Sequence, residues 1–202
     1  MKKRITIIDY GMGNLRSVEK AFKYLGYEVN VCYEKEEILL AEKIVLPGVG
    51  AFQKAIENIK NLDLYHVIKQ KIIDKTPFLG ICLGYQLLYE FSEEGNEKGL
   101  NLLKGSVIKF KENNKFKVPH MGWNKILVNE RSRLLKGLSG NYFYFVHSYY
   151  VNNSNKDIVS STSYHGLGFD SSIEYENIYA TQFHPEKSGD VGLEILDRFG
   201  GL

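Results

Sequence analysis

A cysteine stands in a setting that suits nucleophilic catalysis. Cys82 lies in the sequence Gly80-Ile81-Cys82-Leu83-Gly84, directly after the apolar run 76–79. Glycines two residues before and two residues after a nucleophile are typical of a sharp strand-to-helix turn that holds it in a strained backbone conformation. The turn would point the thiol at the positive end of the following helix, which favours the thiolate. We therefore predict that Cys82 is a nucleophile.

A base and an orienting carboxylate follow near the end of the chain. His184 and Glu186 are separated by Pro185. In an extended segment, residues two apart point to the same face, so Glu186 can accept a hydrogen bond from one ring nitrogen of His184. The other ring nitrogen is then free to address Cys82, which makes a triad suited to acyl transfer. Each motif alone is weak, because a buried cysteine such as Cys32 is usually core, but together they favour catalysis.

The composition favours one globular domain over residues 1–202. The 26 basic and 24 acidic side chains leave a net charge of +2, so no basic face indicates nucleic acid. No segment approaches the roughly 20 apolar residues that span a bilayer. Two cysteines cannot form a disulfide framework, so a cytoplasmic protein is expected. Neither a metal nor a cofactor is expected, because the spacing of His120 and His147 is not that of metal ligands and His66 and His165 look like surface residues.

The order of apolar and amphipathic segments predicts an α/β fold. In the first half they alternate as in βαβ units, with strands at 5–8, 29–33, 43–46 and 76–79 and helical segments at 14–25, 52–75 and 84–91. The second half has short β-rich runs between polar turns such as 113–115, and ends in a helix at 188–199. We expect an open, mostly parallel sheet flanked by helices, with antiparallel additions in the C-terminal half.

The motif around Cys82 and the His184–Glu186 pair resemble those of class I, or triad, glutamine amidotransferases, whose fold is flavodoxin-like. Further segments resemble the family of glutaminase subunits of imidazole glycerol phosphate synthase, namely 9–15, 47–52, 119–124 and 144–149. The resemblance covers residues 5–199, nearly the whole chain. One departure is Tyr85, which stands where the family usually has methionine and so changes the flank of the nucleophile.

The resemblance implies hydrolysis of L-glutamine to glutamate and ammonia. Cys82 would attack the side-chain amide, and His184 would protonate the leaving ammonia and then activate water. The oxyanion needs backbone N–H donors, one from Leu83 and the other from Val49 or Gly50. Residues that match the family's glutamine-binding positions are Gln86, Ser148 and Tyr149.

The resemblance also implies a partner. The ammonia would pass through an internal channel to a (β/α)8-barrel cyclase subunit in a heterodimer, which makes imidazole glycerol phosphate and aminoimidazole carboxamide ribotide in histidine biosynthesis. Residues that match partner-facing positions are Asn14, His120, Met121, Trp123 and Lys187.

Three alternatives remain open. The chain could be the glutaminase of another amidotransferase, such as anthranilate or pyridoxal-phosphate synthase, although segments 9–15 and 119–124 argue against this. It could be a stand-alone cysteine hydrolase on the same fold, which should turn over well without a partner. A binding protein with an inactive triad is a third possibility, against which stands the presence of all three triad residues.

Overall fold

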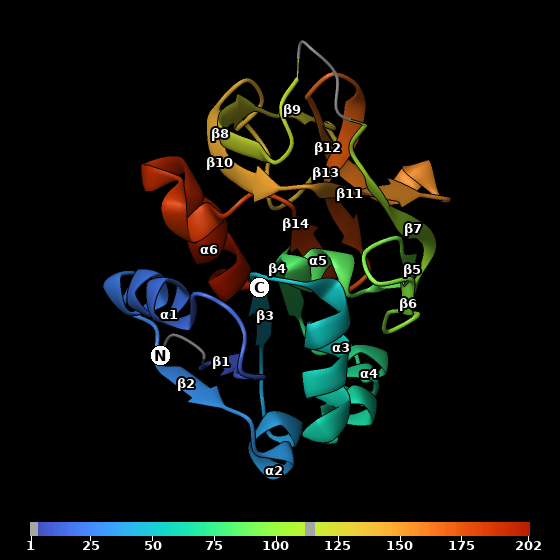
Figure 1. Cartoon of the computed structure of the whole chain (residues 1–202). Coiled ribbons are helices and arrows are strands. Elements are labelled where there is room, and N and C mark those ends of the chain that lie inside the picture. The colour runs from blue at the N-terminus through green and yellow to red at the C-terminus, as the bar shows by residue number, and fades with distance from the viewer. Residues whose placement is uncertain (1–3, 112–115) are drawn as a thin grey trace.

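A parallel sheet forms the centre of the protein. The computed structural model describes residues 4–111 and 116–202 (Figure 1), so the predicted turn at 113–115 lies outside the described residues. Neighbouring strands of the parallel part run in the order β2 (Val29–Cys32), β1 (Ile5–Ile8), β3 (Ile44–Gly48), β4 (Phe78–Cys82) and β14 (Ile178–Thr181). The predicted mostly parallel sheet with flanking helices is therefore confirmed.

Helices cover both faces of this sheet because each strand alternates its apolar side chains. Helices α1 (Leu15–Tyr24) and α6 (Gly189–Gly201) lie on one face, and α3 (Phe52–Asn61) and α4 (Leu64–Ile73) on the other (Figure 1). Successive strand residues pack into opposite cores, as Ile7 does with the α1 and α6 side and Ile8 with the α3 and α4 side.

Antiparallel strands extend the sheet beyond β14, as predicted for the C-terminal half. In order of pairing they are β13 (Gly168–Tyr175), β11 (Tyr149–Asn153), β7 (Leu103–Lys109), β5 (Tyr89–Ser92) and β6 (Glu97–Lys98), of which only β5 and β7 pair in parallel. Strand β12 (Val159–Tyr164), which follows the 3₁₀ turn η1 (Lys156–Ile158), branches from β13 and pairs on its other side with β9 (Leu127–Val128). A separate hairpin pairs β8 (His120–Lys125) with β10 (Tyr142–His147).

Local differences from the predicted elements have tertiary causes. The helix expected over 84–91 is only one turn, α5 (Leu83–Gln86), because the carbonyls of Leu87, Leu88 and Tyr89 accept hydrogen bonds from segment 100–103 instead of continuing the helix. The expected helical segment 52–75 is broken at Asp63, whose φ is +57°. A short helix that was not predicted, α2 (Lys35–Leu39), follows β2.

Strand β3 also runs further than predicted. Its expected end was at Leu46, but Pro47 and Gly48 continue the parallel register opposite Ile81 and Cys82. The segment that follows β3 is thereby held beside Cys82. Among residues 4–111 and 116–202, no helix is long and apolar enough to cross a membrane.

Candidate active site

Cys82 occupies a strained turn between β4 and α5. Its φ and ψ are +55° and −105°, a backbone conformation that non-glycine residues rarely adopt. The flanking glycines allow the turn to close. A Cβ atom on Gly84 would lie 1.8 Å from the carbonyl oxygen of Leu46, and one on Gly80 would lie 2.8 Å from the carbonyl oxygen of Gly84. The G-x-C-x-G spacing is therefore a packing requirement of this turn.

His184 is held in one orientation by bonds to its backbone and ring. Its N–H donates to the Tyr144 carbonyl oxygen at 2.9 Å, and the Ser188 hydroxyl donates to its carbonyl oxygen at 2.6 Å. Nδ1 lies 2.7 Å from Oε1 of Glu186, and the two side chains are only 2% and 1% exposed. The predicted pairing is present, but the segment is not extended, since residues 185–187 form the 3₁₀ turn η2 (Pro185–Lys187).

The charge state of His184 follows from its neighbours. Burial lowers the pKa of the imidazole, but the charge of Cys82 and the hydrogen-bonded carboxylate of Glu186 outweigh this and raise the pKa to about 10. The ring is therefore protonated at neutral pH when Cys82 is a thiolate. Its Nε2 is buried and, apart from the interaction with Cys82, has no hydrogen-bond partner among the described residues, which leaves this nitrogen available for proton transfer.

A cavity of about 370 Å³ opens at Cys82. It brings together Cys82 and all the residues predicted for the oxyanion and the substrate, which are Val49, Gly50, Leu83, Gln86, Ser148 and Tyr149. Its remaining lining was not predicted and consists of Glu94, Pro119, Val146 and His147. The side chain of Tyr85 is fully buried and absent from this lining, because it points to Tyr89 and Asn153. The residue that departs from methionine is therefore not part of the cavity wall.

The contact of Gln182 with Cys82 was not predicted. Nε2 of Gln182 lies 3.5 Å from Sγ of Cys82, and Oε1 of Gln182 accepts a hydrogen bond from Nε2 of Gln86 at 2.9 Å. The signal was in the sequence, because Gln182 is a polar residue in a β-rich run and lies two residues before His184, on the same face.

The match to known proteins is with one enzyme family. Residues 6–200 match the family Glutamine amidotransferase class-I. This chain belongs to that family. Among its relatives, imidazole glycerol phosphate synthase subunit HisH of Caldanaerobacter subterraneus subsp. tengcongensis is 48% identical over 200 residues, which cover 98% of each chain. The subunit of the same name from Methanocaldococcus jannaschii is 50% identical over 197 residues, or 96% of this chain and 97% of the relative.

Solved structures share the architecture of this class-I glutamine amidotransferase. One described as a glutamine amidotransferase covers 98% of this chain and 99% of its own, with a TM-score of 0.76 and 18% identity. The structure of PurLQS from Thermotoga maritima covers 98% of this chain and 98% of its own, with a TM-score of 0.74 and 18% identity. At these identities the likeness concerns the fold alone.

Three of the residues predicted to face a partner of this amidotransferase lie around Tyr144. Met121 and Trp123 are 63% and 56% exposed on β8. The Trp123 and Tyr144 ring centroids are 6.1 Å apart, and the Lys187 ammonium lies 5.6 Å from the Tyr144 centroid. We call Met121, Trp123, Tyr144 and Lys187 the hairpin face. The Tyr144 centroid is 6.4 Å from that of His184, so this face borders the triad.

The other two residues predicted to face the partner, Asn14 and His120, are less exposed than Met121 and Trp123. Asn14 is half-buried at the start of α1. His120 is only 5% exposed and lies beneath the hairpin face, where its Nδ1 is 2.9 Å from Nε2 of His147. His165, expected on the surface, is half-buried and stacks on His120 with ring centroids 4.2 Å apart. His66 is exposed, as expected.

These buried histidines form a polarised chain of hydrogen bonds. Nδ1 of His147 lies 2.8 Å from the Tyr149 carbonyl oxygen, which can only accept, so His147 carries its proton there. His120 then donates from Nδ1 to His147, and its Nε2 accepts from Asn124. Burial lowers the pKa values of His120 and His147 to about 4 and about 3, so both rings are neutral at physiological pH.

No group of three or more His, Cys, Asp or Glu side chains within 4–111 and 116–202 could hold a metal ion.

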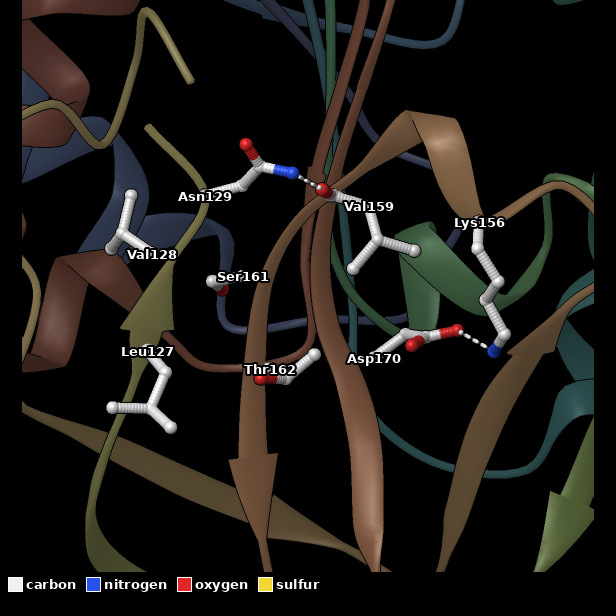
Figure 2. Close-up of a pocket in the computed structure, with 8 residues that line it drawn as sticks. All are labelled: Leu127, Val128, Asn129, Lys156, Val159, Ser161, Thr162 and Asp170. Carbon is white, nitrogen blue, oxygen red and sulfur yellow. Dashed lines mark hydrogen bonds and ion pairs between the residues drawn. The ribbon is translucent and has the colours of Figure 1, made fainter. Parts of the chain in front are cut away.

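A second cavity of about 400 Å³ lies away from the triad. Figure 2 shows it between β9, β12 and the ion pair of Lys156 with Asp170, whose Nζ and Oδ2 are 2.7 Å apart. The Asn129 side-chain amide donates to the Val159 carbonyl oxygen at 3.4 Å on its rim. The cavity contains none of the predicted catalytic residues.

Proposed function

We propose that this chain hydrolyses L-glutamine to glutamate and ammonia with Cys82 as nucleophile, His184 as acid and base, and Glu186 as its orienting partner. The observation that carries the proposal is the turn that places Cys82 in a cavity beside the buried His184–Glu186 pair. Membership of the class-I glutamine amidotransferase family supports the reaction class. We take residues 1–202 as one glutaminase domain.

In the first half of the reaction, the Cys82 thiolate attacks the side-chain amide carbon, and the C=O electron pair moves onto oxygen. The imidazolium of His184 gives its Nε2 proton to the amide nitrogen, the C–N bond breaks and ammonia leaves. The raised pKa of His184 supports this order, because the ring already carries the proton when the thiolate attacks.

In the second half, the neutral ring takes a proton from water, and the resulting hydroxide attacks the thioester carbon. The C–S bond breaks, glutamate leaves and the thiolate with its imidazolium is restored. Glu186 accepts a hydrogen bond from Nδ1–H in a fixed direction, which keeps Nε2 aimed at the reacting atoms.

The oxyanion is assigned to backbone donors. The Leu83 N–H stands at the first residue of α5, where an intrahelical partner is missing by geometry. A second donor comes from Val49 or Gly50, which line the cavity opposite. Two preorganised N–H groups of this kind stabilise developing negative charge without reorganisation during the reaction.

The glutamine amino-acid end fits polar groups deeper in the same cavity. Both N–H groups of the Gln86 amide are used, by Tyr149 and Gln182, so its Oε1 is left to accept from the substrate ammonium. Glu94, which also lines the cavity, adds a negative charge for that ammonium. We assign the substrate carboxylate to the segment of Ser148 and Tyr149, whose carbonyl oxygens are already hydrogen-bonded within the protein.

We further propose that the ammonia is used by a (β/α)8-barrel cyclase subunit bound at the hairpin face in the cytoplasm. The relatives named imidazole glycerol phosphate synthase subunit HisH support this partner. The products would be imidazole glycerol phosphate and aminoimidazole carboxamide ribotide. Met121, Trp123 and Lys187 would contact the partner directly. Asn14 would contact the partner from the start of α1. His120 is buried and would support the hairpin face from beneath.

The test is glutamate release by the purified chain, alone and with the cyclase and its ribotide ligand. We expect slow release alone and strong activation in the complex, because the Val49 and Gly50 peptides must present an N–H to the oxyanion. Equal, full activity without the cyclase would favour a stand-alone cysteine hydrolase. The absence of glutamate release under both conditions would contradict the proposal.

A further inference from the structure

Besides His184, the sulfur of Cys82 has two polar contacts of opposite character. The Val146 carbonyl oxygen, 4.0 Å away, can only accept and so suits the protonated thiol. The Gln182 side chain lies 3.5 Å away on the other side, 0% exposed. Whether Gln182 presents its N–H or its oxygen to the sulfur decides which form of the thiol it favours.

The hydrogen bonds around Gln182 fix the orientation of its amide. The Tyr149 carbonyl oxygen has no proton to donate, so the Gln86 group 3.0 Å from it must be Nε2. The same Nε2 lies 2.9 Å from the Gln182 amide, which must therefore present Oε1 to Gln86. Nε2 of Gln182 is left facing Sγ. The His147 Nδ1–H, which also donates to Tyr149, secures the far end of this chain.

We propose that Gln182 is a further catalytic residue, which donates a hydrogen bond from Nε2 to the Cys82 thiolate. The proposal deepens the proposed glutaminase function and rests on it. A buried anion needs hydrogen-bond donors, and a donor to the charged form lowers the cost of that form. Among the described residues, the titratable groups that interact with the charge of Cys82 are His184, which is paired with Glu186, and Tyr10.

The donor has a use in both halves of the reaction. Before attack, it raises the fraction of Cys82 present as thiolate. After water has added to the thioester, the C–S bond breaks and the electron pair returns to sulfur, where the Gln182 N–H again meets a negative charge. Loss of the donor should therefore lower kcat for glutamine more than it changes KM, since the amide reaches sulfur and not the amino-acid end of the substrate.

The experiment measures alkylation of Cys82 by iodoacetamide as a function of pH, located by peptide mass spectrometry on the full chain. The thiolate displaces iodide, so the rate follows the thiolate fraction. Gln182→Met removes the donor at similar length, and Gln182→Glu replaces it with a carboxylate. We expect the alkylation midpoint to move to higher pH by about one unit in the first variant and further in the second. Gln70→Met and Gln70→Glu, on an exposed part of α4, are the matched controls.

A second variant covers the case in which Gln182→Met does not fold. Gln86→Met keeps Gln182 but removes the bond that orients its amide, and we expect a smaller shift in the same direction. An unmoved midpoint in a folded Gln182 variant, or in folded Gln86→Met if neither Gln182 variant folds, would overturn the proposal. Alkylation does not use glutamine, so the two tests are independent. A wild-type chain without glutaminase activity would contradict the proposed function, and the alkylation result would still decide whether Gln182 donates to the thiolate.

Discussion

The ammonium group of Lys187 lies over the ring of Tyr144, 5.6 Å from its centroid, and Tyr144 in turn borders His184. Lys187 directly follows the triad carboxylate in sequence. Trp123 contacts the same tyrosine ring from the neighbouring strand. The hairpin face therefore borders His184, on the side where we propose that the cyclase binds.

Lys187→Ala and Trp123→Ala should uncouple the two reactions. In the complex with the cyclase, we expect more glutamate than imidazole glycerol phosphate, because ammonia would leak to water where the wall is opened. The KM for glutamine should change little, since neither residue lines the cavity. Measuring both products in one reaction decides this, with Lys35→Ala, on α2 at the opposite end of the molecule (Figure 1), as control. A retained one-to-one ratio in both variants would contradict the interface roles.

Tyr10→Phe should leave the protein at least as stable as the wild type. The Tyr10 hydroxyl is buried against Gly48 and makes no hydrogen bond within residues 4–111 and 116–202. Removing a buried polar group without a partner relieves a desolvation cost of about 1 kcal/mol. Tyr27→Phe is the contrast, because its hydroxyl bonds to Asp197 at 2.9 Å, and its loss should cost about 1 kcal/mol. Denaturant unfolding of the two variants gives the comparison, and equal losses would argue against it.

Gly84→Ala should disrupt the nucleophile turn. The added Cβ would lie 1.8 Å from the Leu46 carbonyl oxygen, and strand backbone cannot move aside cheaply. We expect a loss of about 3 kcal/mol or more in the free energy of unfolding, together with loss of glutaminase activity. Gly201→Ala, at the end of α6 with nothing near the new Cβ, is the matched control. Wild-type stability in Gly84→Ala would mean that α5 does not pack on β3 as described.

Stability should fall as the pH drops below about 6.5. Burial lowers the pKa values of His120 and His147 to about 4 and about 3, whereas the ordinary histidine value is 6.5. Between those values the unfolded chain binds more protons than the folded one, so each histidine adds a slope of up to about 1.4 kcal/mol per pH unit. His184 acts in the opposite direction, and only above about pH 6.5, because its pKa is raised.

The measurement for this prediction is the unfolding free energy from pH 5 to pH 7. His120→Gln should flatten the slope, and His66→Gln, at an exposed position, should leave it unchanged. A slope that is identical in all three proteins would show that the buried histidines do not govern the acid side.

The central sheet, the turn at Cys82 and the pairing of His184 with Glu186 could be predicted because their signals are local. Short apolar runs mark the parallel strands, and the residue spacing around Cys82 and His184 indicates the turn and the pair. The predictions that were wrong failed because contacts with segments distant in the sequence decide the structure there. Residues 87–91 have helical spacing, but the carbonyl oxygens of residues 87–89 accept hydrogen bonds from the N–H groups of segment 100–103. Helix α5 therefore ends after one turn. His165 is polar and near a turn, which predicts an exposed side chain, but its ring stacks on His120 and is half-buried. The orientation of Gln182 depends on partners 33 and 96 positions away, which no local pattern records.

The most direct test of the nucleophile uses Cys82→Ala in the complex with the cyclase. Synthesis of imidazole glycerol phosphate is measured with glutamine and, separately, with an ammonium salt as the nitrogen source. If the thiolate acts only in ammonia release, glutamine-dependent synthesis should be abolished and ammonium-dependent synthesis should match the wild type. Equal loss of both activities, or retention of the glutamine-dependent one, would contradict the assignment of Cys82 as the nucleophile of a glutaminase.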